Sequence, residues 1–320
     1  MQILRSVPDA AASPIALTIG NFDGVHLGHQ AMLARLRAAA SARGLSACVM
    51  TFEPHPREFF APDQAPVRLT TLREKLELLA QYGVDRVQVC RFNFARAQVT
   101  AQEFIERILV RGMGVRWLQV GDDFRFGARR AGDLAMLKAF APGYGYEVEA
   151  MPTVLLDGER VSSTAVRDAL MAGDAVRAAR LLGRPYSIRG RVVHGDRLGH
   201  KIGFPTANVQ LKHNRPPLSG IFAVEFHRAG GERLRGVASL GMRPTVKAQG
   251  APPVLEVYLF DFGAEIYGEQ VRVDFLHKFR DEAKYVDIET LQQQIARDVA
   301  DARGFFERHD AALAVAGTGK

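Results

Sequence analysis

The sequence has few cysteines and no long apolar run. Its 320 residues include two cysteines, Cys48 and Cys90, each alone in an apolar stretch, which argues against a disulfide framework and against a cysteine-based metal site. No stretch approaches the ~20 apolar residues that a membrane-spanning helix needs. The first ten residues contain Arg5, Pro8 and Asp9 and lack the apolar core of a secretory signal. We therefore expect a cytoplasmic protein with no membrane partner.

The sequence also lacks a concentrated block of charge. The net charge is +7, and it divides into +4 for residues 1–184 and +3 for residues 185–320. Nucleic-acid-binding proteins usually gather their positive charge on one face or arm, so we expect no nucleic-acid partner. An even, modest excess suits polyphosphate substrates equally well. The length predicts about two domains, and the 47% hydrophobic content is ample for globular cores.

Residues 1–184 alternate between strand and helix patterns. The expected buried strands are the apolar runs Ile15–Ile19, Ala47–Phe52, Arg86–Val89 and Trp117–Val120. The expected helices are Gln30–Ala42, Leu72–Gln81 and Ala101–Arg111. This alternation predicts an α/β domain with a doubly wound parallel sheet, whose ligands bind beyond the carboxyl ends of the strands.

The stretch Gly20–His29 lies between the first expected strand and the first expected helix. A strand, a glycine-rich turn and a helix start form a backbone anion site, because the first amides of a helix lack partners within it. His26 and His29 are three residues apart, so both would project from one face of the first turn. Imidazoles there can donate to phosphate oxygens. A structural turn and half of a metal site are the alternatives.

Three further segments follow expected strands or open a helix. Thr51–Pro56 is a proline-rigid loop in which Phe52 or His55 could face a flat ring, or a rigid loop with no ligand. Gly121–Gly127 combines carboxylates, aromatics and an arginine, which suits a flavin or nucleotide as well as a solvated turn. Val161–Arg167 offers hydroxyls that can cap a helix, bind a triphosphate, or do both.

Together these four segments resemble, in order, motifs of the FAD synthetase module of bacterial bifunctional riboflavin kinase/FAD synthetases. The resemblance implies a Rossmann-like nucleotidyltransferase domain that adenylylates FMN with ATP. It assigns His26 and His29 to the ATP phosphates and the transition state. It assigns Asp123 to the flavin-nucleotide end. The remaining nucleotide-binding positions that it implies are Gly20, Phe22, Asp23, Gly24, Ser163, Thr164 and Arg167.

The pattern changes after residue 184. Short strand-like runs predict a small antiparallel barrel over Ile188–Val193, Ile221–Phe226, Arg235–Leu240, Val254–Phe260 and Gln270–Phe275. A helix is expected over Asp287–Phe306, with one apolar stripe packed on the barrel, and the last ten residues are expected to be frayed.

Polar side chains in this half suggest a second site. Thr206 and Asn208 are two residues apart, so on a strand both face the same way and offer hard oxygen ligands suited to Mg²⁺. A plain polar sheet face is the alternative. Glu256 lies within an apolar strand, where it either faces solvent or acts as a general base toward a hydroxyl.

These segments resemble the riboflavin kinase family, on Gly203–Asn208, Arg243-Pro244-Thr245, Glu256 and Ile266-Tyr267-Gly268. The resemblance implies a six-stranded barrel that transfers the γ-phosphate of ATP to riboflavin. It places Mg²⁺ and ATP at Thr206 and Asn208, with Gly203 and Pro205 beside them, and makes Glu256 the base. Departures from the family pattern are His200-Lys201, in place of an arginine-containing pair, and Ala238–Gly241.

The expected function is therefore bifunctional: residues 1–184 make FAD from FMN, and residues 185–320 make FMN from riboflavin. ATP, Mg²⁺, riboflavin, FMN and FAD are the expected ligands, and weak self-association is a further expectation. Two alternatives remain open. One module could be inactive and only support the other, or the chain could be a flavin- or nucleic-acid-binding regulator without turnover.

Overall fold

The structure is a computed structural model that describes residues 1–195, 199, 202–211, 215–241 and 253–317. The chain forms two compact units. The N-terminal unit comprises residues 1–66 and 70–163, and the C-terminal unit comprises residues 67–69 and 164–320. Each unit is described by itself.

The N-terminal unit contains a six-stranded parallel sheet in the order β1-β4-β3-β2-β5-β6. Its strands are β1 (Gln2–Leu4), β2 (Ile15–Ile19), β3 (Ser46–Glu53), β4 (Arg86–Arg91), β5 (Val115–Gly121) and β6 (Glu147–Met151). All four expected strands are confirmed, three of them slightly longer than expected. The sequence pattern missed β1 and β6 because they are edge strands that do not form apolar runs.

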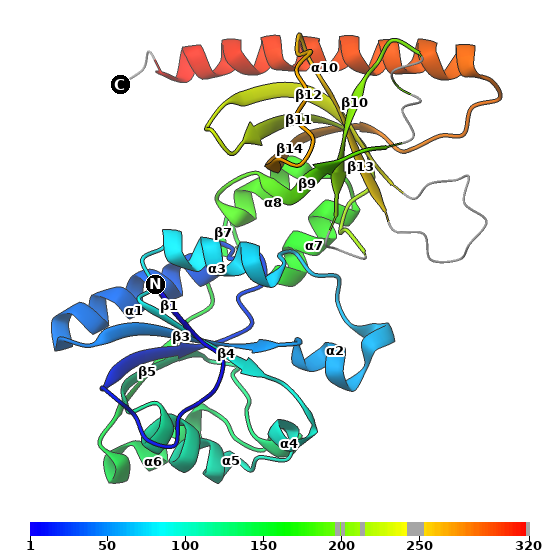
Figure 1. Ribbon diagram of the computed structural model, residues 1–320. Coiled ribbons are helices and arrows are strands. Elements are labelled where there is room, and N and C mark those ends of the chain that lie inside the picture. The colour runs from blue at the N-terminus through cyan, green and yellow to red at the C-terminus, as the bar shows by residue number, and fades with distance from the viewer. Residues whose placement is uncertain (196–198, 200–201, 212–214, 242–252, 318–320) are drawn as a thin grey trace. The chain divides into compact units, whose positions relative to one another are not determined.

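Helices cover both faces of this sheet (Figure 1). Alternation along β2 divides its side chains between two cores. Ala16 packs in the core beneath α1 (Leu27–Arg43) and α3 (Leu72–Gln81). Ile15 and Leu17 belong to the opposite core, which also includes side chains of η2 and α6. The two cores make the sheet a rigid support for the loops at its carboxyl ends.

The helices depart from the expected bounds in two places. The first helix begins at Leu27 rather than Gln30, because His26 caps it. The segment expected as one helix over Ala101–Arg111 is α5 (Ala101–Glu103) followed by the π-helical η2 (Phe104–Gly112). The other elements of this unit are α2 (Pro56–Phe60), η1 (Pro62–Gln64), α4 (Phe94–Ala97), η3 (Ala128–Arg130), α6 (Leu134–Tyr144), β7 (Leu155–Leu156) and β8 (Glu159–Arg160).

The C-terminal unit contains a closed six-stranded antiparallel barrel in the order β10-β13-β12-β11-β14-β9, as expected. Its strands are β9 (Tyr186–Val193), β10 (Thr206–Gln210), β11 (Gly220–Arg228), β12 (Arg233–Gly241), β13 (Val254–Leu259) and β14 (Gln270–Arg280). Two helices precede it along the chain, α7 (Ser163–Met171) and α8 (Ala175–Leu182), and α8 contacts β9 and β14. The first residue of α7, Ser163, belongs to the N-terminal unit.

Alternation along the barrel strands separates a packed interior from an outer face. Leu255 and Val257 of β13 are fully buried inside, whereas the side chains between them point outward. The helix α10 (Ile288–Gly317) lies along the outside of the barrel (Figure 1) and packs Ala302 against Ile221 and Val237. The expectation of frayed final residues is wrong for residues 311–317, since α10 continues past Phe306 to Gly317. Residues 318–320 lie outside the described part of the chain.

Both cysteine thiols are buried, as expected. Burial raises the pKa of Cys48 to about 12 and that of Cys90 to about 11, so both are protonated at neutral pH. Among the residues that the structure describes, no helix combines the length and apolarity that crossing a membrane requires.

Two candidate active sites

Two histidines stack at the N-terminus of α1, beyond the carboxyl end of β2. His26 is the N-cap, and its Nδ1 accepts a hydrogen bond from the backbone N–H of His29 over 3.3 Å. The two rings stack with centroids 3.7 Å apart. Because Nδ1 is the acceptor, the proton of a neutral His26 ring lies on Nε2, which leaves that atom as a donor. The expected shared face of the two histidines is confirmed.

The close stacking depends on Gly28. A Cβ on that residue would lie 3.1 Å from Cε1 of His26, so any larger side chain would crowd the ring. The first turn of α1, all of which is described, contains no acidic residue. The positive end of the helix dipole is therefore not offset by a carboxylate from the same turn, which favours an anion.

His29 is held in its neutral form. Burial lowers its pKa well below the usual 6.5, and the charges of His26 and Lys75 lower it further. Its Nδ1 is buried with no hydrogen-bond partner in the described part of the chain. The fully buried ring of Phe22 lies 4.8 Å from it, centroid to centroid. An anion bound here would raise the pKa of His29 and use its unsatisfied nitrogen.

We expect His29 to make the stability of the protein depend on pH. Its pKa is lowered in the folded state, so below about pH 6.5 the unfolded chain binds a proton that the folded protein does not. The contribution of His29 is complete above pH 6.5 and falls as the pH drops toward the lowered pKa, by at most about 1.4 kcal/mol per pH unit. Urea unfolding at pH 7.5 and 5.5, followed by fluorescence of the buried Trp117, measures this. H29N should lose less stability than the parent protein between the two pH values, and equal losses would contradict the assignment.

The glycine-rich loop is fixed by Thr70, a residue that the sequence analysis missed. The Oδ1 of Asp23 accepts bonds from the backbone N–H (3.0 Å) and hydroxyl (3.1 Å) of Thr70. The Thr70 hydroxyl accepts from the N–H of Gly24 over 3.1 Å, and the hydroxyl of Ser163 donates to the carbonyl of Asp23 over 2.8 Å. Three predicted residues, Asp23, Gly24 and Ser163, are thus brought together. The sequence signal that could have drawn attention to Thr70 is the capping-box pattern that begins at the neighbouring Thr71.

The other predicted residues of the first site lie in different settings. Gly20 follows β2 directly, and a Cβ there would lie 3.1 Å from the ring of Phe22. Asp123 is exposed beyond β5 and accepts a bond from Nη2 of Arg160 over 2.9 Å. Thr164 and Arg167 belong to the C-terminal unit, where Nε of Arg167 donates to the carbonyl of Val67 over 2.5 Å.

Aromatic rings gather beyond the carboxyl ends of β3 and β4. Phe92 lies edge-on to Phe52, Phe59 and Phe60, with centroids 5.5 to 6.0 Å apart. Phe60 is 66% exposed, which is unusual for a ring with so many aromatic neighbours. His55 does not join them as a free ring, because its Nδ1 caps α2 by accepting from the N–H of Arg57 over 3.0 Å. The sequence analysis missed Phe59 and Phe60, although adjacent phenylalanines in a proline-bounded loop were a visible signal.

The second site lies on the outer face of the barrel. Asn208 of β10 pairs directly with Glu256 of β13, which in turn pairs with Ser239 of β12. Thr206 pairs with Tyr258 on the same face. Because side chains opposite one another across an antiparallel ladder lie on one face, Thr206, Asn208 and Glu256 share it. The predicted orientation of Thr206 and Asn208 is therefore confirmed, and Glu256 lies across from Asn208 rather than remote from it.

The donor set on this face fits a magnesium ion. The side chain of Asn208 is buried, and its Oδ1 has no hydrogen-bond partner within the described residues. A Cβ at Gly195 would lie 2.4 Å from Nδ2 of Asn208, and one at Gly199 would lie 3.4 Å from Oγ1 of Thr206. The backbone of Gly195 therefore lies against Asn208, and that of Gly199 lies near Thr206. An unused amide oxygen and a nearby hydroxyl are hard donors, of the kind that Mg²⁺ takes together with water and phosphate.

The remaining residues of this predicted site surround the start of β10. Gly203 has a φ of +82°, in the left-handed region, and Pro205 directly precedes Thr206. Beside them, the N–H of Phe204 donates to the carbonyl of Gly199 over 2.8 Å. The segments His200-Lys201 and Arg243-Pro244-Thr245 lie outside the described residues.

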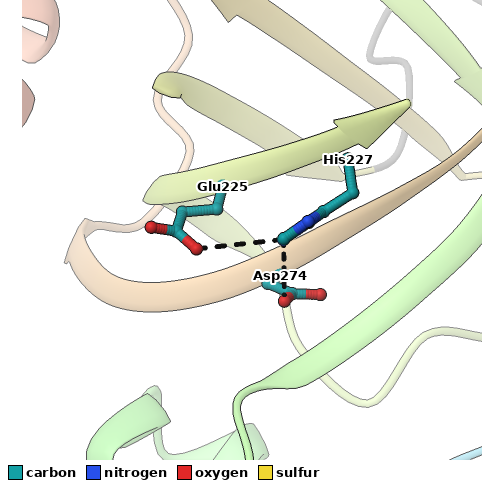
Figure 2. Close-up of side chains that lie close together, drawn as sticks. All are labelled: Glu225, His227 and Asp274. Atoms are coloured by element: carbon teal, nitrogen blue, oxygen red, sulfur yellow. Dashed lines mark ion pairs between the residues drawn. The ribbon is translucent and has the colours of Figure 1, made fainter. Parts of the chain in front are cut away.

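A third polar cluster lies on β11 and β14 (Figure 2). Nε2 of His227 is 3.1 Å from Oδ2 of Asp274 and 3.8 Å from Oε2 of Glu225. Such a set could ligate a metal, but Nη2 of Arg272 already lies 3.1 Å from Oδ2 of Asp274 and 3.2 Å from Nε2 of His227. Burial raises the pKa of Asp274, and the positive charge of Arg272 opposes this. The guanidinium supplies the countercharge, so the cluster is an ion-pair network.

Comparison with known proteins places the chain in a family. Residues 9–165 match the FAD synthetase family, and residues 182–306 match the riboflavin kinase family. A bifunctional riboflavin kinase/FMN adenylyltransferase of Haemophilus influenzae is 46% identical over 308 residues, which are 96% of this chain and 99% of the relative. The enzyme of that name from Pseudomonas fluorescens is 50% identical over 286 residues, 89% of this chain and 91% of the relative.

Similarity to a solved structure extends across both units. A crystal structure described as a macrolide-efflux protein from Streptococcus pneumoniae has a TM-score of 0.81 and 30% sequence identity, and the match covers 93% of this chain and 97% of that one. The sequence relatives match over nearly their whole length as well. This chain therefore belongs to the family of bifunctional riboflavin kinase/FMN adenylyltransferases.

Proposed function

We propose that this chain phosphorylates riboflavin with ATP to give FMN, and then transfers an adenylyl group from ATP to FMN to give FAD and pyrophosphate. The observation that carries this proposal is the presence of both polar sites in one chain that aligns with bifunctional relatives over 96% of its length. The stacked histidines suit phosphate chemistry, and the barrel face suits a metal-bound nucleotide and a hydroxyl.

In the adenylyl transfer, a phosphate oxygen of FMN attacks the α-phosphorus of ATP. The bond from that phosphorus to the bridging oxygen breaks, and the electron pair leaves with pyrophosphate. No nucleophile from the protein is needed, so catalysis depends on alignment and on stabilising negative charge. The N-terminus of α1, with its positive dipole end, and the imidazole of His26 would donate to phosphate oxygens. His29 has an unsatisfied Nδ1 available for the same purpose.

The flavin ring of FMN fits the aromatic cluster beyond β3 and β4. Phe60 and Phe59 are exposed there, and Phe92 supports them edge-on. A planar isoalloxazine ring would cover apolar area that is otherwise in water and would stack on the exposed rings. This position lies at the ligand-binding edge of the sheet, as does the histidine pair after β2.

In the kinase reaction, Thr206 and Asn208 would hold Mg²⁺ with the phosphates of ATP. The metal would neutralise charge on the transferring phosphoryl group. Glu256 lies opposite Asn208 on the same face, where its carboxylate can accept the proton of the 5′-hydroxyl as that oxygen attacks the γ-phosphorus. The products are FMN and ADP.

We expect Glu256→Gln to lower kcat for FMN formation by at least about 100-fold, since a general base commonly contributes this much. The substitution keeps the size of the side chain and removes its ability to take a proton. Steady-state rates from riboflavin, with adenylylation of supplied FMN assayed in the same preparation, measure the effect. E265Q changes an exposed glutamate of the same unit and should leave both rates unchanged. Full kinase activity in E256Q would exclude Glu256 as the base.

Other parts of the proposal rest on the sequence. Residues 1–184 would carry the adenylyl transfer and residues 185–320 the kinase reaction, in the cytoplasm. The partners are small-molecule substrates, and self-association would be weak. No nucleic-acid partner is proposed, because the positive charge is spread evenly along the sequence.

A chromatographic time course tests the proposed function. The protein receives riboflavin, ATP and Mg²⁺, and a parallel reaction starts from FMN. FMN followed by FAD supports both activities. FMN without FAD in either reaction would leave only the barrel active, and FAD only from supplied FMN would leave only the N-terminal site active. Flavin binding with no product would favour a regulator.

A further inference from the structure

Lys75 is a buried cation in the N-terminal unit, which also contains the histidine pair. Its side chain lies in the first part of α3 and the residue is only 6% exposed. Burying an ammonium group is costly unless negative charge compensates it. Its positive charge also acts on His29, since it helps to lower the pKa of that ring. Lys75 therefore contributes to the electrostatics of the adenylyl-transfer site although it lies on a different element.

The start of α3 is attached to the glycine-rich loop. Thr70 bonds to both Asp23 and Gly24 of that loop, through contacts of 3.0 to 3.1 Å. Thr71 caps α3, and the N–H of Lys75 donates to the carbonyl of Thr71 over 3.0 Å. One short chain of hydrogen bonds thus connects the backbone of Lys75 to the loop that precedes His26. The start of α3 is thereby held against the glycine-rich loop within this unit.

Two carboxylates fix the geometry of the glycine-rich loop and of the start of α3. Oδ1 of Asp23 accepts both bonds from Thr70, and Oε2 of Glu74 accepts the N–H and the hydroxyl of Thr71 at 2.7 Å. Close by, the buried Nδ1 of His29 has no partner in the described part of the chain. A cation, a stacked imidazole pair and an unsatisfied ring nitrogen together favour a polyanionic ligand.

We propose that Lys75 is a catalytic residue of the adenylyl transfer, whose ammonium group donates to a phosphate oxygen of ATP and to the pyrophosphate as it leaves. The proposal rests on adenylyl transfer being the reaction of this site. An ammonium has three N–H donors, so it can keep a protein partner and still bind a phosphate oxygen. The proton stays on the nitrogen throughout. The negative charge that grows on the leaving pyrophosphate strengthens the interaction as the bond to the α-phosphorus breaks.

Lys75→Gln tests the role, and Arg73→Gln is its matched control. Both substitutions remove one positive charge from the first turns of α3, but the side chain of Arg73 is 66% exposed and pairs with Glu77. We expect K75Q to lower kcat/KM for FAD formation from FMN roughly 10- to 100-fold, the range for a charge-assisted hydrogen bond. R73Q should change it less than about twofold, since surface ion pairs contribute little. K75R, which retains the charge, should recover part of the rate.

The kinase reaction of the same chain separates catalysis from folding. FMN formation by K75Q should stay within about twofold of the parent protein, since the ammonium acts locally in the other site. Binding of inorganic pyrophosphate, measured by calorimetry, should weaken in K75Q and not in R73Q. Unchanged FAD formation and pyrophosphate binding in K75Q would overturn the proposal, as would a parallel loss of both activities with a lowered unfolding temperature. Absence of FAD formation by the parent protein would instead contradict the proposed function.

Discussion

Replacing Asn208 with alanine is expected to lower FMN formation by about 10³-fold, because a metal ion on the transferring phosphoryl group is worth several kcal/mol. Oδ1 of Asn208 is buried and has no protein partner in the described part of the chain, so its loss would remove an oxygen available to the ion. The adenylylation of supplied FMN should continue at the parental rate. Initial rates of both reactions, measured over a range of Mg²⁺ concentrations, give the result.

Two companion variants distinguish loss of the metal from damage to the barrel. N208D keeps an oxygen ligand and should retain more kinase activity than N208A. Q210A removes an exposed side chain from the same strand and the same face, and should leave the kinase rate unchanged. If N208A retains FMN formation at low Mg²⁺ concentration, Asn208 is not a ligand. Equal losses in N208A and Q210A would point to distortion of β10.

Replacing His29 with alanine is expected to have the opposite pattern, with FAD formation lowered about 10²- to 10³-fold and FMN formation preserved. The ring of His29 is stacked on His26 and supported by Phe22, and its buried Nδ1 is unsatisfied in the described structure. Because the ring of His29 is already oriented, a hydrogen bond from it would strengthen as negative charge develops on the phosphate oxygens. Because the effect arises in the transition state, kcat should fall more than the KM for ATP rises.

The control for His29 lies further along the same helix. Arg35 of α1 is half exposed and pairs with Glu149, so R35A changes the helix surface without touching the histidine pair. It should leave FAD formation within about twofold, as expected for a surface ion pair. If H29A makes FAD at the parental rate, His29 takes no part in the reaction. If H29A loses both reactions, the substitution has damaged the fold beyond the adenylyl-transfer site.

The sequence pattern predicted the central architecture because burial determined it. The four apolar runs became β2 to β5, and five of the six barrel strands followed from short runs between glycines and prolines. The sixth, β10, was not among those runs. The edge strands β1 and β6 were not predicted, because their side chains are incompletely buried and do not form an apolar run. β6 carries Glu147 and Glu149, whose partners Arg43 and Arg35 come from α1, a pairing that no local pattern reveals. The continuation of α10 to Gly317 was missed because the ends of a chain are commonly poorly ordered.

The sequence predicted which residues belong to the candidate sites, but not how most of them are arranged in space. Spacing placed His26 and His29 on one face, and a strand period placed Thr206 with Asn208. The pairing of Asn208 with Glu256 depends on register between strands that are far apart in the sequence. The link from Asp23 to Thr70 spans 47 residues, and the burial of Lys75 depends on the packing of α3. Such contacts follow from tertiary structure, which local periodicity does not encode.

The barrel has the residues proposed for catalysis on its outside and its packing inside, and this affects how the protein can change over generations. Along β13 the inward positions Leu255 and Val257 are fully buried, whereas the outward positions between and after them are Glu256 and Tyr258. Substitutions of one set alter how well the barrel holds together, and substitutions of the other alter what it does. Selection can therefore adjust thermal tolerance and nucleotide chemistry separately, on alternate residues of one strand.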